Sequence, residues 1–238
     1  MIVIRLPETI YHARGAIDNG TFAGRWHFSF DQYSDPEHVL FGALRVFNDD
    51  TLSPGAVWPL HPHRGIEVVT YCARGEFRHA DEHGKGGILQ KGWVQHTSVG
   101  RGMYHSEINN HPDEPMRFIQ MWFLPDAPDL TPAVQQKAVE QRERTNKFLP
   151  LVSNRHPGAL PIFAAAQVFS CCLEAGRNVE YPLEERSGAY LYVLEGGPVL
   201  LNGQNLPALG AAQVTGPEDL RVQAREAAEL LLVEVTLG

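Results

Sequence analysis

Two tripeptides carry the side chains best suited to bind a metal ion. His61-Pro62-His63 precedes a strand-like run, and His105-Ser106-Glu107 follows a glycine turn at residues 100–102. In a β-strand, residues i and i+2 point to the same face, about 6.6 Å apart along the backbone. Each tripeptide therefore presents two donors to one side, and two such strands facing each other can offer three imidazoles and one carboxylate to one ion.

This donor set restricts the metal but does not identify it. Nitrogen and oxygen ligands suit Fe(II), Mn(II), Ni(II), Co(II), Cu(II) or Zn(II). Neither tripeptide has a cysteine beside it, which argues against a sulfur-rich structural zinc site. Three imidazoles and one carboxylate leave one or two coordination positions open, as a catalytic metal requires.

Glu67 has several possible roles in such a site. It has the same strand parity as His61 and His63 and can face inward with them. It can replace Glu107 as the carboxylate ligand, accept a hydrogen bond from a ligand imidazole, or form part of a base above the metal. Glu107 and Glu67 are thus both candidates for accepting a substrate proton.

The remaining histidines are interpreted as structural or exposed. His79 and His83 lie in an evident turn, so we expect both to be exposed. His96 has no paired donor at strand spacing and is expected to be structural.

Short apolar runs predict the elements that must position these residues. Runs rich in Val, Ile, Leu, Phe and Tyr alternate with Gly and Pro turns, which is typical of all-β sandwiches and barrels. One helical signal interrupts this pattern: Thr131 can cap, Pro132 suits the first turn, and residues 133–144 are rich in Gln, Glu, Lys and Arg. Its apolar periodicity is thin, so part of it can be extended.

The chain divides into two β-rich halves. The spacing from Gly55 to Gly75 equals that from Gly176 to Gly196, and each pair brackets a strand-like run. A polar, proline-punctuated stretch lies between the halves. We therefore expect a metal-binding domain at residues 1–125, a helical or irregular connection at 126–160 and a second β domain at 161–238.

Composition excludes several classes of protein. The 238 residues carry a net charge of −8 without a basic run, so direct binding to nucleic acid or to an anionic membrane surface is not expected. An apolar stretch at 159–173 is interrupted and too short to span a bilayer. Three cysteines, an odd number, favour a reducing compartment, so we expect a cytoplasmic protein.

The metal-binding tripeptides also carry a family resemblance. Gly55, then His61-x-His63, Glu67 and Gly75, resembles the first cupin motif, and Gly100-Arg101-Gly102-Met103-Tyr104-His105 resembles the second. The sequences His-Pro-His-Arg-Gly and Gly-Arg-Gly-Met-Tyr-His-Ser-Glu are similar to those of the pirin family in particular. Trp26-His27-Phe28-Ser29-Phe30 resembles an N-terminal signature of the same family.

The resemblance implies an all-β bicupin, in which two β-barrels follow each other and one metal lies in the N-terminal barrel. The residues that match the pirin ligands are His61, His63, His105 and Glu107, with Glu67 outside the ligand set. Counted from the glycines, the matching positions of the second half hold Pro182, Glu184, Gln223 and Arg225. The C-terminal barrel is therefore expected to lack a metal site.

The resemblance also implies an activity. Several pirins resemble quercetin 2,3-dioxygenases, which open the heterocycle of a flavonol with O₂ and release carbon monoxide. Fe(II) is then the first expectation for the metal, and a planar flavonol and O₂ are the expected partners. The alternative is a metal-dependent redox sensor or regulatory protein that binds another protein. A slot lined by apolar side chains and open to solvent would favour a planar substrate, whereas a plugged barrel would favour the sensor.

Overall fold

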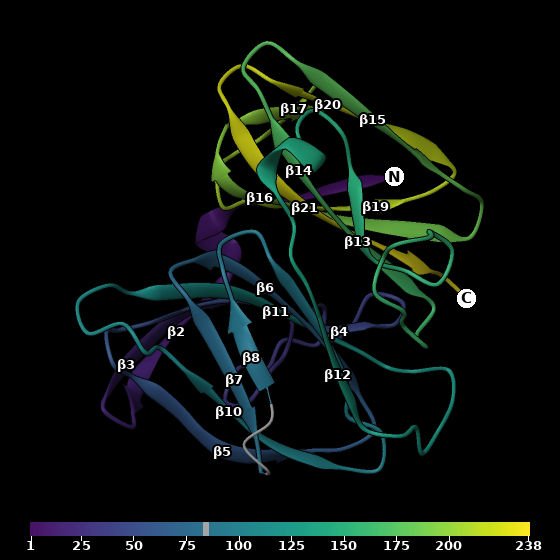
Figure 1. The fold of residues 1–238 in the computed structure, drawn as a ribbon. Helices are drawn as coiled ribbons and strands as arrows, with labels where there is room; N and C mark the ends of the chain where they lie inside the picture. The colour runs from purple at the N-terminus through teal and green to yellow at the C-terminus, as the bar shows by residue number, and fades with distance from the viewer. Residues whose placement is uncertain (83–85) are drawn as a thin grey trace. The chain divides into compact units, whose positions relative to one another are not determined.

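The computed structural model describes residues 1–82 and 86–238, and it is nearly all β-structure (Figure 1). This confirms the expected bicupin class. The described residues contain two short 3-10 turns, η1 (Pro7–Thr9) and η2 (Gln141–Glu143), and no helix long and apolar enough to cross a membrane. The chain groups into two compact units: Tyr11–Val139 with Leu160–Ala164, and Met1–Ile10 with Glu140–Ala159 and Ala165–Gly238.

The N-terminal barrel consists of two antiparallel sheets. Their strand orders are β12-β9-β6-β11-β4-β3-β2 and β5-β10-β7-β8 (Figure 1). The strands are β2 (Tyr11–Ile17), β3 (Gly20–Trp26), β4 (Leu44–Leu52), β5 (Val57–His63), β6 (Glu67–Arg74), β7 (Phe77–Asp81), β8 (Gly86–Leu89), β9 (Val94–Ser98), β10 (Met103–Ile108), β11 (Met116–Phe123) and β12 (Ala133–Lys137).

The C-terminal barrel repeats this topology. Its sheets have the orders β1-β19-β16-β21-β14-β13 and β15-β20-β17-β18, so β19-β16-β21-β14 matches β9-β6-β11-β4, and the second sheet matches β5-β10-β7-β8. The shared order supports the internal repeat inferred from the glycine spacings. The strands are β1 (Ile2–Arg5), β13 (Leu149–Val152), β14 (Ala166–Leu173), β15 (Asn178–Leu183), β16 (Ser187–Gly196), β17 (Val199–Leu201), β18 (Gln204–Leu206), β19 (Ala211–Thr215), β20 (Glu218–Ala224) and β21 (Ala228–Thr236).

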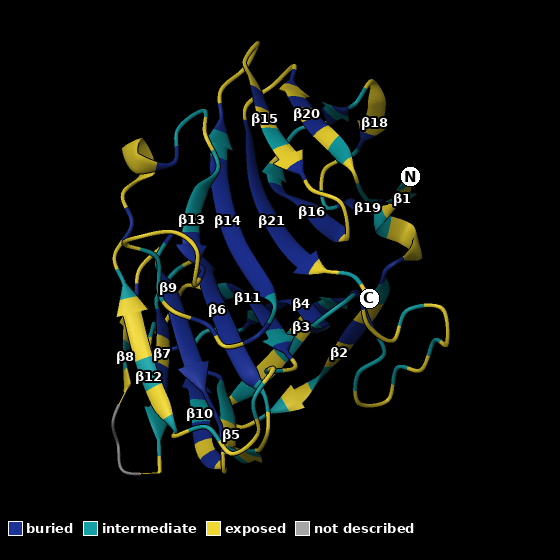
Figure 2. Ribbon diagram, turned by 90° about the vertical axis from the view of Figure 1, so that its right-hand side faces the viewer, coloured by how far each residue is buried: buried dark blue, intermediate teal, exposed yellow. Residues whose placement is uncertain are grey.

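Apolar side chains fill the C-terminal barrel. Strands β14, β16 and β21 are buried along most of their length, whereas β15 and β20 alternate between buried and exposed residues (Figure 2). On β15 and β20 the inward positions are Val179, Leu183, Leu220 and Val222. The glycine-based register was therefore one residue out, because Pro182, Glu184, Gln223 and Arg225 are exposed.

The expected helix after Thr131 is wrong for its first part. Residues 133–137 form β12, which pairs with β9 from Ala133 opposite Ser98 to Lys137 opposite Val94. The Gln136 amide also donates to Gln95 Oε1 at 2.9 Å. The edge of β9 offers backbone hydrogen-bond partners to residues 133–137. The weak apolar periodicity of this segment did not stabilise a helix against this pairing.

Polar groups remain inside the N-terminal barrel. Asp50 on β4 is buried and accepts a hydrogen bond from Trp26 Nε1 at 3.0 Å. Loss of hydration raises the pKa of this carboxyl well above its usual value, the Trp26 hydrogen bond lowers it, and the charges of Asp49 and Glu107 raise it further. Asp50 is therefore favoured as the neutral acid in the folded protein.

Glu67 ties a distant segment to the outside of this barrel. Its carboxylate accepts hydrogen bonds from the backbone amides of Phe163 (3.0 Å) and Ala164 (2.7 Å) and from His96 Nε2 (3.0 Å). Glu67 is fully buried, so each donor would lack water if the carboxylate were lost.

We predict that Glu67→Gln lowers the free energy of unfolding by about 1–3 kcal/mol, because one buried donor loses its acceptor. Urea denaturation of the metal-free protein measures this. The control is Glu180→Gln, which removes an exposed ion pair with Arg221 and should change stability by less than about 0.5 kcal/mol. An unchanged Glu67→Gln variant would contradict the anchoring role.

We predict that Asp50→Asn stabilises the metal-free protein increasingly as pH rises from 4 to 8. Folding raises the pKa of Asp50 above its value of 3.8 in the unfolded chain. Above pH 3.8 the unfolded chain therefore loses a proton that the folded wild-type protein keeps, so the free energy of unfolding falls as the pH rises. Asparagine stays neutral and still offers an oxygen to Trp26. Urea titrations at several pH values test this, and a stability difference independent of pH would refute it.

Candidate metal centre

Three histidines converge inside the N-terminal barrel. One ring nitrogen of each of His61, His63 and His105 lies within 4.8 Å of the others, and this is the group of potential metal ligands found among the described residues. The strands β5 and β10 are antiparallel neighbours, with His61 directly opposite His105. The pairing therefore joins two motifs that are far apart in the sequence.

The position of β5 at a sheet edge explains how this strand accommodates prolines next to its histidines. An edge strand tolerates residues without an N–H donor, and β5 contains both Pro59 and Pro62. The register with β10 shifts between His105 and Glu107, so that two residues of β5, Pro59 and Leu60, lie opposite Ser106, as in a β-bulge of β5. His61 Nδ1 lies 2.8 Å from the carbonyl oxygen of Pro59. Donation from Nδ1 leaves Nε2 with a free lone pair.

The histidine nitrogens have a spacing that fits one metal ion. His61 Nε2 and His105 Nε2 are 3.1 Å apart. Two nitrogens that each lie about 2.1 Å from an ion, about 90° apart, are separated by about 3 Å. His63 Nε2 is buried and has no hydrogen-bond partner among the described residues. A cation would satisfy this orphaned nitrogen, so the residues present fit a bound metal.

Burial favours the neutral form of the three imidazoles. Loss of hydration is the main cause that lowers the pKa of His61, of His63 to about 4, and of His105 to about 2. Repulsion from a protonated neighbour lowers the last two pKa values further; the neighbour is His61 for His63, and His61, His79 or His63 for His105. Metal ligation requires the neutral form.

Glu107 lies on the same strand as His105 and belongs to a short hydrogen-bonded chain. The amide of Gln120 donates to Glu107 Oε1, and Trp122 Nε1 donates to Gln120 Oε1 at 2.9 Å. The Trp122 ring packs against His63 with centroids 4.6 Å apart. Burial raises the pKa of Glu107 to about 7, and the Gln120 hydrogen bond opposes this shift. A nearby cation would favour the ionised form.

Glu67 is directed away from this cluster. Val68 packs with Met103 and Trp122, which flank the histidines, and successive residues of a strand face opposite sides. Glu67 therefore faces the outer side of β6, where it binds His96 and the segment 160–164. The even-numbered spacing of Glu67 from His61 and His63 does not place it on their side of the barrel, because β5 and β6 belong to different sheets.

His79 is a site residue that sequence reasoning missed. It is 2% exposed, which overturns the expectation of an exposed turn residue. It lies on β7 opposite Glu107, and its Nε2 is 2.9 Å from His105 Nδ1. The sequence signal that could have indicated an inward-facing strand residue is the i, i+2 spacing of Phe77, His79 and Asp81 before the turn. His83 lies outside the described residues.

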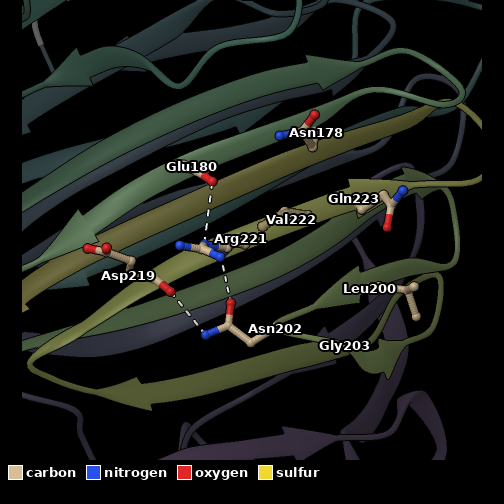
Figure 3. Close-up of a pocket in the computed structure, with 9 residues that line it drawn as sticks. All are labelled: Asn178, Glu180, Leu200, Asn202, Gly203, Asp219, Arg221, Val222 and Gln223. Carbon is tan, nitrogen blue, oxygen red and sulfur yellow. Dashed lines mark hydrogen bonds and ion pairs between the residues drawn. The ribbon is translucent and has the colours of Figure 1, made fainter.

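Two hollows differ in their relation to the histidines. A cavity of about 510 Å³ in the N-terminal barrel is lined by Met103, Val134 and Asp81, among others. Met103 is opposite His63 and Asp81 is opposite His105 in the strand register. A hollow of about 620 Å³ lies on the exposed face of β15 and β20, where Arg221 pairs with Glu180 (Figure 3). None of the four expected ligands lines either hollow, but only the first lies beside the strand that carries His105 and Glu107.

Known families match both halves of the chain. Residues 10–123 match the family described as Pirin, and residues 151–235 match the family described as Quercetinase C-terminal cupin domain. The expected pirin resemblance is thus confirmed.

Individual proteins match over nearly the full length. A pirin-like protein of Caulobacter vibrioides is 36% identical over 92% of this chain and 95% of its own. A quercetin 2,3-dioxygenase of Escherichia coli K12 is 27% identical over 99% of both chains. The crystal structure of YhhW from Escherichia coli, which covers 100% of this chain and 99% of its own, has a TM-score of 0.91 at 25% identity. The bacterial pirin YhhW in complex with nickel(II), which covers 100% of both chains, has a TM-score of 0.89 at 26% identity. These matches and the shared fold show that the chain belongs to the pirin family.

Proposed function

We propose that this protein holds one divalent transition metal and opens the heterocycle of a flavonol such as quercetin with O₂, releasing carbon monoxide. The ligands are His61, His63, His105 and Glu107. The observation that carries the proposal is the convergence of the imidazoles of His61, His63 and His105, among which His63 Nε2 is buried without a hydrogen-bond partner among the described residues. The quercetin 2,3-dioxygenase from Escherichia coli supports the choice of reaction.

Fe(II) is our first assignment for the metal, and Ni(II) is the alternative, because a similar pirin has been solved with nickel(II). Both ions accept imidazole and carboxylate ligands. When bound, the ion supplies a Lewis acid that stabilises the negative oxygen of a deprotonated flavonol 3-hydroxyl.

The chain's own residues supply orientation and a proton acceptor. Gln120 holds one oxygen of Glu107, so the carboxylate has a defined direction within the barrel. We assign Glu107 both as a ligand and as the group that can take the 3-hydroxyl proton. Glu67 supports the barrel wall, because three donors already occupy its carboxylate.

The cavity beside β10 is the place that we propose for a substrate. Met103 and Val134 offer apolar contacts, and Asp81 can accept hydrogen bonds from phenolic hydroxyls. A planar polyphenol combines these two properties. We also propose a cytoplasmic location, in agreement with Cys72, Cys171 and Cys172, none of which forms a disulfide.

We predict that protein purified without a chelating tag binds about one metal per chain after anaerobic reconstitution with Fe(II), Mn(II), Ni(II), Co(II) or Cu(II). The loaded protein should consume quercetin in air, measured by loss of the flavonol absorbance and by release of carbon monoxide. His63→Ala and His105→Ala should lose both metal and turnover, since each removes an imidazole from the cluster.

His12→Ala, at an exposed histidine on β2, is the matched control and should retain metal and turnover. Stoichiometric metal without quercetin turnover would refute the dioxygenase assignment and favour the sensor. Failure to bind any of the metals would refute the metal centre itself.

A further inference from the structure

The contact between His79 and His105 joins a third strand to the metal centre. His79 Nε2 lies 2.9 Å from His105 Nδ1, and both residues are 2% exposed. The two rings have centroids 5.0 Å apart and are inclined by 64°, so the contact is through their edges and not by stacking. Because His105 Nε2 faces His61, its two ring nitrogens have separate partners.

Metal ligation determines which histidine donates in this pair. A neutral imidazole that binds a metal through Nε2 must carry its proton on Nδ1. His105 therefore donates from Nδ1, and His79 must accept with Nε2 and carry its own proton on Nδ1. A fully protonated His79 would place an N–H against the N–H of His105. Ligation of His105 through Nε2 would thus leave His79 neutral, with its proton on Nδ1, a buried nitrogen that has no hydrogen-bond partner in the described part of the chain.

We propose that His79 is a positioning residue of the metal centre, which accepts the Nδ1–H of His105 and aims His105 Nε2 at His61 and His63. This inference rests on the metal site of the proposed function. Nothing in the proposal requires His79 to touch the metal or the substrate.

The other hydrogen-bonded ligand shows the same arrangement with a different acceptor. His61 directs Nδ1 to the carbonyl of Pro59 on its own strand. The acceptor for His105 is a side chain from β7, so it can be removed without altering the strand that carries the ligand. Partners of this kind hold the ring orientation and raise the basicity of a metal-bound imidazole.

Two substitutions separate the acceptor role from simple packing. His79→Phe keeps an aromatic ring but has no acceptor, so the buried Nδ1–H of His105 loses its partner. His79→Gln can place an amide oxygen near the position of Nε2. The control is His96→Gln, at a buried histidine that hydrogen-bonds Glu67 on the outer side of the barrel.

The readouts are the dissociation constant for Co(II), obtained by competition with a chromophoric chelator, and the visible spectrum of the Co(II) protein. We expect His79→Phe to bind about 10- to 100-fold more weakly with an altered spectrum. His79→Gln and His96→Gln should remain close to wild type in both measurements. In Zn(II)-loaded wild-type protein, ¹⁵N NMR should show His79 protonated on Nδ1 only and His105 on Nδ1 only.

Native affinity and an unchanged spectrum in His79→Phe would overturn the proposal, and so would an equal loss in the Phe and Gln variants. If His79→Phe does not fold, the NMR tautomers of the wild type decide, and a proton on His79 Nε2 overturns it. A wild-type protein that binds no metal would overturn the proposed function together with the role of His79.

Discussion

The metal centre depends on the antiparallel pairing of β5 with β10. This pairing sets His61 opposite His105 and thereby brings together two tripeptides separated by most of a barrel. The edge position of β5 permits the prolines around His61, and β5 bulges at Pro59 and Leu60. Alternation along β10 turns His105 and Glu107 to the same side. A shift of one residue in this register would turn the histidines to the outside.

The two barrels share a topology but differ in what fills them. The inward positions of β15 and β20 hold Leu183, Leu220 and Val222, which pack in one apolar cluster. The corresponding sheet of the N-terminal barrel turns imidazoles and a carboxylate inward. Since buried polar groups are stable only with partners, the N-terminal barrel needs the hydrogen bonds of Gln120, Trp122 and His79 around these side chains. One fold therefore encloses an apolar core in one copy and a cluster of polar side chains in the other.

Local patterns were sufficient for the fold class and for the histidine cluster. Alternation within a strand pairs His61 with His63, and the glycine turns locate both motifs along the chain. Pairing between strands that are distant in the sequence could not be predicted from local patterns. For example, β12 forms because β9 offers an open edge, and β1 pairs with β19 at the far end of the sequence. His79 and Glu67 were misread for the same reason, because their partners His105, Phe163 and Ala164 come from other elements. The glycine spacing detected the repeat but missed its register by one residue.

The most direct test of the central claim is an anomalous difference map from crystals of the metal-loaded protein, recorded at the absorption edge of the metal. The account predicts one peak per chain in the N-terminal barrel, about 2.0–2.2 Å from the Nε2 atoms of His61, His63 and His105 and from an oxygen of Glu107. A peak bound by other residues, or none at the three histidines, would contradict it.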